Sequence, residues 1–256
     1  MARIYTLVNQ KGGVGKTTTA INLGAYLSQH GQRVLIVDID PQSNATSCLG
    51  IDKHSVEKGS YQALLGEYPP ASLILKNERL DLSLLPSSPS LAGAEIELVD
   101  QTERNTRLRN ALTALNGDFD YILLDCPPSL GLLTINGLMA AQDGVIIPVQ
   151  CEYLALEGLG QLTQTIHQVR SALYPDLRVR GVVLTMFDSR TNLANDVVSE
   201  VNNHFPKQVF KAVIPRSIRL AEAPSYGLPI SEYAPNSVGA KAYDALAKEL
   251  MEGDKI

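Results

Sequence analysis

The stretch from Lys11 to Thr18, with the sequence KGGVGKTT, has the residue types that hold phosphate groups. Its three glycines allow backbone amides to turn inward and approach phosphate oxygens closely. Lys16 supplies a positive charge for the β- and γ-phosphates, and Thr17 supplies a hydroxyl for Mg²⁺. The helix expected from Thr17 adds the positive end of its dipole. We therefore expect a phosphate loop whose contacting residues are Lys11, Gly12, Gly13, Val14, Gly15, Lys16, Thr17 and Thr18.

Other interpretations of this loop fit less well. The standard phosphate loop has a glycine five residues before Gly15, whereas this chain has Gln10 there, followed by a second lysine, Lys11. A dinucleotide-binding turn requires a third glycine where Thr18 stands. A turn without a ligand does not require a lysine and a threonine in register after its glycines. The pattern favours a phosphate loop that departs from the standard form at its start.

Three aspartates, Asp38, Asp40 and Asp125, lie at or just past the ends of predicted strands. Ligands of an open parallel sheet bind outside the carboxyl ends of the strands, so these carboxylates can converge on the phosphate loop. Mg²⁺ takes few direct protein ligands and keeps several of its waters. We expect Thr17 and the nucleotide to ligate Mg²⁺ directly and Asp125 to hold it through water. Asp38 is equally compatible with a strand-end residue that caps a loop.

Short apolar runs alternate with segments of helical period along the chain, a pattern typical of strands buried on both faces and of the helices that connect them. It predicts an α/β fold: a single doubly wound, mostly parallel sheet with helices on both faces. The expected strands are Ile4–Val8, Val34–Val37, Leu82–Leu85, Tyr121–Leu124, Val145–Val149, Val182–Leu184 and Val209–Ile214. The expected helices are Thr17–His30, Asn105–Leu115, Leu130–Ala141, Leu156–Leu173, Leu193–Phe205 and Val238–Met251. No linker divides residues 1–256, so we expect one domain, with residues 50–80 and 86–93 as loop-rich excursions at the sheet edge.

The composition argues against several classes of protein. A hydrophobic fraction of 45% is too high for a disordered chain, and no apolar run is long enough for a transmembrane helix. The N-terminus runs into a strand pattern rather than a signal peptide. The three cysteines, Cys48, Cys126 and Cys151, are too scattered for a disulfide framework or a CxxC metal site, so we expect a cytoplasmic protein. A net charge of −5 by itself argues against binding to nucleic acid.

The phosphate loop resembles the deviant Walker A motif of the ParA/MinD group of P-loop ATPases. Two further blocks are similar to acidic motifs of that group: Val37–Gln42 with Asn44–Thr46, and Leu123–Ser129, which is similar to its Walker B segment. The blocks Pro148–Gly158, Leu184–Asn192 and Ile214–Pro224 resemble the chromosomal ParA (Soj) branch in particular. The resemblance implies a P-loop NTPase fold and a slow, Mg²⁺-dependent ATPase, with ATP and Mg²⁺ as cofactors.

The resemblance also implies roles for single residues. Lys11 matches the signature lysine that reaches across a nucleotide-sandwich homodimer to the phosphates held by the other subunit. Asp40 matches the residue that positions or activates the attacking water, so the implied catalytic set is Lys11, Lys16 and Asp40. The block Ile214–Ser217 resembles the base-contacting loop, although Ser217 stands where relatives often carry asparagine. The implied adenine contacts are Met186, Pro215, Arg216 and Ser217, with Phe187 and Asp188 packed nearby.

The distribution of charge modifies the inference from the net charge. Residues 170–220 hold eight basic and four acidic residues, although the chain as a whole is acidic. This local excess is compatible with an ordinary solvated surface. The ParA/Soj branch, however, binds double-stranded DNA without sequence preference, and Arg190 and Arg219 resemble its DNA-contacting positions. Phosphate neutralisation by a dimer would exceed that of one subunit, so DNA binding would depend on ATP.

The resemblance thus implies an ATP-dependent dimerising switch for chromosome or plasmid segregation, associated with the nucleoid and stimulated by a ParB-type partner. The alternative is a MinD-like, membrane-associated regulator of cell division. That alternative needs a basic amphipathic helix at the C-terminus, whereas the tail from Lys248 to Ile256 is short and mixed in charge, so we expect no membrane binding. A third possibility is a metabolic ATP-dependent ligase or kinase on the same scaffold.

Overall fold

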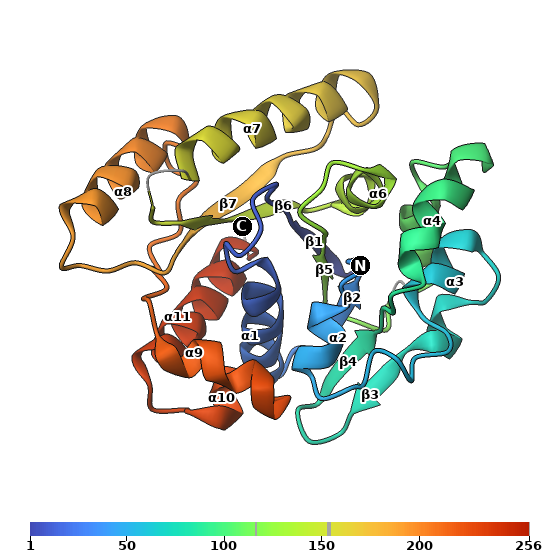
Figure 1. Ribbon diagram of the computed structural model, residues 1–256, viewed down its shortest axis with the longest axis horizontal. Helices are drawn as coiled ribbons and strands as arrows, with labels where there is room; N and C mark the ends of the chain where they lie inside the picture. Colours follow the sequence, from blue (N-terminus) through green and yellow to red (C-terminus); the bar gives the residue numbers. More distant parts are fainter. Residues whose placement is uncertain (116, 153–154, 256) are drawn as a thin grey trace.

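The computed structural model describes residues 1–115, 117–152 and 155–255, and the strands in these ranges form one seven-stranded sheet (Figure 1). The strand order is β3-β4-β2-β5-β1-β6-β7, and all neighbours run parallel except the edge pair β3 and β4. This arrangement confirms the predicted fold class. The strands are β1 Arg3–Leu7, β2 Val34–Asp38, β3 Leu75–Asn77, β4 Leu82–Leu85, β5 Tyr121–Asp125, β6 Gly144–Gln150 and β7 Val179–Thr185.

Helices cover both faces of the sheet (Figure 1). The longer ones are α1 Lys16–Gln29, α6 Leu132–Ala140, α7 Ala155–Ala172, α8 Asn192–His204 and α11 Val238–Gly253. The shorter ones are α2 Asn44–Cys48, α3 Ser60–Leu65, α4 Leu91–Glu97, α5 Arg107–Thr113, α9 Ile218–Glu222 and α10 Ile230–Tyr233, with 3₁₀ turns at Pro70–Leu73, Leu98–Asp100 and Ala223–Tyr226. Alternation along the strands assigns the faces, since Ile36 packs with α1 and α11 whereas Leu35 and Val37 pack with α3 to α6.

The register of three strands brings the predicted site together. In the β2–β5 pair Asp38 lies opposite Asp125, and in the β1–β5 pair Asp125 lies opposite Leu7. The carboxyl ends of β1, β2 and β5 therefore stop at the same level of the sheet. The phosphate loop leaves β1 from this level, so two aspartates lie beneath it on the neighbouring strands, as expected for an open parallel sheet.

Most predicted elements agree with the structure to within a few residues, but one predicted strand was wrong, and the short elements of the edge excursions were not predicted. Val209–Ile214 is not a strand of the sheet: it follows β7 through an isolated bridge at Val209 and backbone hydrogen bonds to Val182 and Leu184. The edge excursions contain α3, α4 and β3, although their sequences carry no strong periodic signal. Short elements of this kind depend on contacts with the rest of the molecule rather than on local propensity.

In the described ranges, no helix is both long enough and apolar enough to cross a membrane.

Candidate nucleotide-binding site

The phosphate loop adopts a left-handed backbone at two of its glycines. Gly13 and Gly15 have φ angles of 74° and 90°, which place them in the left-handed region that favours glycine. Gly15 is also the residue that precedes α1, and no side chain of the described residues caps the first turn there. The amino end of α1 therefore presents free backbone amides and the positive end of its dipole to the loop, as an anion site requires.

The loop is fixed to neighbouring strands by polar contacts at both ends. Asn9 accepts a hydrogen bond from the backbone amide of Lys11 at 3.0 Å and donates one to the carbonyl of Pro148 at 2.8 Å. The hydroxyl of Thr185, at the end of β7, donates to the carbonyl of Val14 at 2.8 Å. These contacts hold the loop over β6 and β7 in addition to β1. Neither Asn9 nor Thr185 was predicted, because both act through backbone atoms of the loop and match no motif.

Lys16 is the buried cation of the site, with only 7% of its surface exposed. Burial lowers the pKa of its ammonium group, and the nearby carboxylates of Asp125 and Asp40 oppose that shift. Lys11 is half-buried at the start of the loop. The two lysines that the sequence singles out therefore differ in environment, since one is enclosed with the carboxylates and the other reaches solvent.

Thr17 and Asp125, the two residues predicted to hold Mg²⁺, are in direct contact. The hydroxyl of Thr17 donates to Oδ2 of Asp125 at 2.6 Å. Asp125 is fully buried, and its Oδ1 has no hydrogen-bond partner among the described residues. Burial first, and then the charge of Asp38, raise the pKa of the Asp125 carboxyl above its usual range. A buried, unsatisfied carboxylate oxygen next to a hydroxyl fits a hard cation or the water bound to one.

Asp38 is committed to the loop that follows β2. Its Oδ2 accepts from both the backbone amide and the hydroxyl of Thr46, at 2.9 and 2.7 Å, and its Oδ1 accepts from the amide of Asp40 at 3.1 Å. The same Thr46 hydroxyl accepts from the amide of Ser87 at 2.9 Å. Of the two interpretations that the sequence leaves open, these contacts favour the loop-capping one. Burial raises the pKa of the Asp38 carboxyl, and these hydrogen bonds counteract the shift.

Asp40 lies in the loop that Asp38 holds. Its Oδ1 accepts from the amide of Gln42 at 2.9 Å, and its backbone carbonyl accepts from the hydroxyl of Ser87 at 2.9 Å. Its Oδ2 has no hydrogen-bond partner in the part of the chain that the structure describes. Asp40 is therefore held in place by its backbone and by one carboxylate oxygen, while the other oxygen remains able to accept a proton or a hydrogen bond.

A cavity of about 260 Å³ opens beside the phosphate loop. Gly15 and Thr18 line its loop side, and all four predicted adenine contacts line it as well: Met186, Pro215, Arg216 and Ser217. Phe187 and Asp188 are not among the lining residues; Phe187 packs with the helices over β6 and β7, and Asp188 pairs with Arg190. Ile214, which begins the predicted base-contacting block, also lines the cavity, whereas the lining residues Thr185, Leu220, Ala221 and Tyr243 were not predicted.

Backbone pairing shapes the side of this cavity that contains the predicted adenine contacts. The amide of Phe187 donates to the carbonyl of Ile214 at 3.0 Å, and the amide of Arg216 donates to the carbonyl of Phe187 at 2.9 Å. Met186, which lies between β7 and this pairing, has a φ angle of 52°. A positive φ is uncommon for a residue with a side chain, and such conformations are concentrated at ligand sites. The turn at Met186 directs the chain around the cavity.

The arginines of the basic segment 170–220 lie at two different ends of the sheet. Arg178 and Arg180 lie at the amino end of β7, whereas Arg190 follows its carboxyl end and Arg219 lies on α9 beside the cavity described above. The predicted DNA contacts Arg190 and Arg219 are both well exposed. Arg190 pairs with Asp188 through two nitrogens, and Arg219 pairs with Glu222 at 2.9 Å. The net charge of residues 170–220 therefore adds together arginines that lie at opposite ends of the sheet.

Comparisons with known proteins identify similar chains. The AAA domain family matches residues 2–179. The chain is 54% identical over 254 residues to the chromosome partitioning protein ParA of Myxococcus xanthus, covering 99% of this chain and 89% of that one. It is 54% identical over 250 residues to the sporulation initiation inhibitor protein Soj of Bacillus subtilis, covering 98% of each.

A solved structure adds a third comparison. The crystal structure of a cobyrinic acid a,c-diamide synthase from Mycobacterium smegmatis with bound ADP and magnesium superposes with a TM-score of 0.88 at 40% identity, covering 100% of this chain and 96% of that one. One family accounts for the deviant phosphate loop, for the aspartates beneath it and for the similarity to both relatives over nearly the whole chain. The chain belongs to the ParA/Soj family of chromosome-partitioning P-loop ATPases.

Proposed function

We propose that this protein is an ATP-dependent dimerising switch that binds DNA non-specifically and hydrolyses ATP to drive the segregation of a chromosome or plasmid. A ParB-type protein would be its partner. The observation that carries the proposal is the contact between Thr17 and Asp125 beneath a loop that contains both Lys11 and Lys16. The oxygens of Thr17 and Asp125 are ligands of the kind that Mg²⁺ prefers. Lys11 is a second lysine that reaches solvent, whereas Lys16 is enclosed with the carboxylates.

ATP would bind with its phosphates in the loop and its base in the cavity between Thr18 and Ser217. Thr17 would hold Mg²⁺ directly, and Asp125 would hold it through water, in keeping with the unsatisfied oxygen of that carboxylate. Bound Mg²⁺ neutralises charge on the β- and γ-phosphates during phosphoryl transfer. Thr17 would then exchange its present hydrogen bond to Asp125 for the coordination of the ion.

Asp40 is the residue best placed to orient the attacking water, because its backbone is held by Ser87 and Asp38 while Oδ2 stays available. Phosphoryl transfer requires mainly alignment and neutralisation of charge, so one carboxylate and two lysines suffice for a slow ATPase. Lys16 would supply the charge from within its own subunit, and Lys11 would supply it to the partner subunit's nucleotide. Closure of the dimer would thus complete two sites at once.

DNA binding would follow from dimer formation. Arg190 and Arg219 are exposed on the end of the sheet that holds the phosphate loop, so a sandwich dimer would present both pairs. A few arginines on one subunit bind DNA weakly, but doubling the phosphate contacts on one assembly raises the affinity strongly. Hydrolysis would separate the subunits and release the DNA. The protein would then be cytoplasmic and associated with the nucleoid while ATP is bound.

The MinD-like alternative requires an apolar helix face that is free to enter a membrane surface. The apolar face of α11 is occupied, since Tyr243, Leu246 and Leu250 are buried in the cluster that also contains residues of α1. Sedimentation with anionic liposomes in the presence of ATP tests this alternative. We expect the protein to stay in the supernatant, and ATP-dependent co-sedimentation would favour the membrane-associated regulator.

The name of the Mycobacterium smegmatis structure favours testing the third possibility, a ligase or kinase on this scaffold. The test is a screen for a phosphorylated or amidated small molecule after incubation with ATP, Mg²⁺ and candidate acids, against a control with the Lys16→Ala variant. We expect ADP and inorganic phosphate as the sole new products. A product that forms with the parent protein and is absent with the variant would replace the segregation proposal.

A further inference from the structure

Tyr243 is the residue of the base cavity that lies farthest from the phosphate loop in sequence. It is on α11, only 1% of its surface is exposed, and it lines the cavity together with Gly15 and Thr18. Its hydroxyl lies 3.2 Å from the hydroxyl of Thr19, which is fully buried on α1. One buried side chain therefore connects the wall of the base cavity to the helix that carries the phosphate loop.

Thr19 closes the first turn of α1. Its backbone amide donates to the carbonyl of Gly15 at 2.9 Å, and the turn between them contains Lys16, Thr17 and Thr18. A hydroxyl pair at this point fixes the rotation of the turn that presents those three side chains. Loss of one hydroxyl would leave the other buried without that partner, which favours a shift of the turn.

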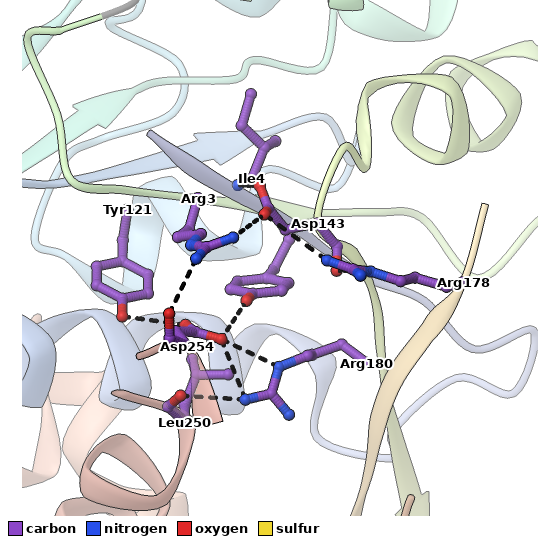
Figure 2. Close-up of polar contacts among 9 residues, drawn as sticks. Arg3, Ile4, Tyr121, Asp143, Arg178, Arg180, Leu250 and Asp254 are labelled. Atoms are coloured by element: carbon purple, nitrogen blue, oxygen red, sulfur yellow. Dashed lines mark hydrogen bonds and ion pairs between the residues drawn. The ribbon is translucent and has the colours of Figure 1, made fainter. Parts of the chain in front are cut away.

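The helix that carries Tyr243 is itself firmly held. Near the middle of α11, Asp244, the residue after Tyr243, pairs with His30, which follows α1, at 2.7 Å. At its carboxyl end, Asp254 accepts hydrogen bonds from Tyr5, Tyr121 and Arg180 at 2.7 to 3.2 Å, and Figure 2 shows Tyr121 and Arg180 converging on its carboxylate. Because both parts of α11 are fixed, the position of Tyr243 in the cavity is fixed as well.

We propose that Tyr243 is a positioning residue of the nucleotide site: its hydroxyl holds the first turn of α1 in register with the base cavity that its own side chain helps to enclose. This inference rests on the proposed function, because it assumes that the loop and the cavity hold the phosphates and the base of one purine nucleoside triphosphate. Tyr243 would then affect the affinity for this nucleotide, because its phosphates must lie in the loop while its base lies in the cavity.

The test compares the affinity of the full-length Tyr243→Phe and Thr19→Val variants for ATP with Mg²⁺, measured by titration calorimetry well below the unfolding temperature of each protein. We expect each variant to bind ATP about three- to tenfold more weakly, the effect of losing one buried hydrogen bond. We expect the double variant to bind no more weakly than the single ones, since the two hydroxyls act as a pair.

Tyr5→Phe is the matched control. Tyr5 is as buried as Tyr243, and its hydroxyl donates to the carboxylate of Asp254, the residue that follows the last turn of the same helix. We expect Tyr5→Phe to lower the unfolding temperature but to keep the parental ATP affinity, because Tyr121 and Arg180 still donate to Asp254 and hold α11 in place. Unchanged affinity in Tyr243→Phe, an equal loss in Tyr5→Phe, or additive losses in the double variant would each overturn the inference. Absence of ATP binding by the parent protein would instead overturn the proposed function.

Discussion

The three aspartates at the carboxyl edge of the sheet carry the same functional group but have different partners. Both carboxylate oxygens of Asp38 accept hydrogen bonds from backbone and hydroxyl donors, whereas one oxygen of Asp125, beside Thr17, has no hydrogen-bond partner among the residues that the structure describes. Asp40 keeps one oxygen available and is held by its backbone. At the scale of the residue, therefore, the roles that we propose for these carboxylates, which are loop-holding for Asp38, metal-holding for Asp125 and water-orienting for Asp40, follow from the donors around each of them.

Lys16→Ala should abolish measurable ATP binding. Lys16 is the buried positive charge of the phosphate loop, and the loss of charged hydrogen bonds to phosphate would weaken affinity by about 100-fold or more. The measurement is fluorescence titration with a labelled ATP analogue. Lys76→Ala is the matched control, because Lys76 is exposed on the edge strand β3, and it should bind as the parent protein does. Binding by Lys16→Ala within tenfold of the parent would contradict the assigned role.

Asp40→Ala should still bind ATP and dimerise but should hydrolyse ATP about 100-fold more slowly, since removal of a positioned proton acceptor costs rates of this order. Phosphate release gives the rate, and sedimentation velocity with ATP gives the dimer. Rapid turnover by the variant would show that Asp40 does not orient the water. Loss of the dimer would show that its main contribution is to the interface.

At the scale of the element, α11 is fixed by an ion-pair and hydrogen-bond cluster at the amino end of the sheet (Figure 2). The carboxylate of Asp254 receives its hydrogen bonds from residues on β1, β5 and β7, three different strands. The backbone carbonyl of the same residue accepts from Arg3 at 2.9 Å. The C-terminal helix is thereby joined to the centre and to one edge of the sheet.

Asp254→Ala should lower the free energy of unfolding by about 3 kcal/mol, because it leaves Arg180 and two tyrosine hydroxyls without their buried partner. Urea unfolding followed by circular dichroism measures the change. Asp244→Ala, on the same helix but with a carboxylate about one-third exposed, should cost less than about 1 kcal/mol. Equal losses in the two variants would show that the Asp254 cluster contributes no more than a surface pair.

The elements also show what local sequence can predict. The central strands and the long helices were predictable because a buried parallel strand and an amphipathic helix each have a periodicity of their own. The phosphate loop was predictable because its residues act at adjacent positions. Tyr243 was not, because it reaches the cavity from a helix more than two hundred residues later, and nothing near it in sequence indicates that neighbour. The segment Val209–Ile214 has the composition of a strand but only isolated pairing with β7.

At the scale of the whole molecule, the net charge of −5 is a poor guide to binding partners. The basic residues of the segment 170–220 are themselves divided between the two ends of the sheet. Neither the net charge of the chain nor that of this segment therefore gives the charge of any one surface. The relevant arrangement is that Arg190 and Arg219 lie at the end where the nucleotide would join two subunits. ATP would then increase the affinity for DNA because dimer formation brings the arginines of two subunits together, and the total charge of the chain would not decide the effect.

Arg190→Glu should weaken DNA binding and leave ATP-dependent dimerisation intact. The change replaces an exposed cation at the nucleotide end of the sheet with an anion, so the slope of log affinity against log salt should fall by about one for each DNA phosphate that the variant no longer neutralises. Arg33→Glu makes the same change of charge at the amino end of β2 and should have a much smaller effect. DNA retention by Arg190→Glu equal to that of Arg33→Glu at low salt would exclude Arg190 from the DNA-binding surface.

The most direct test of the switch is the affinity for non-specific double-stranded DNA without nucleotide, with ADP, with ATP, and with ATP and a ParB-type partner, each across a series of salt concentrations. We predict tight, salt-sensitive binding with ATP alone, weak binding without nucleotide or with ADP, and release of DNA when the partner accelerates hydrolysis. Lys11→Ala should bind ATP but fail to gain DNA affinity from it. DNA binding of equal strength in all four states would contradict the account.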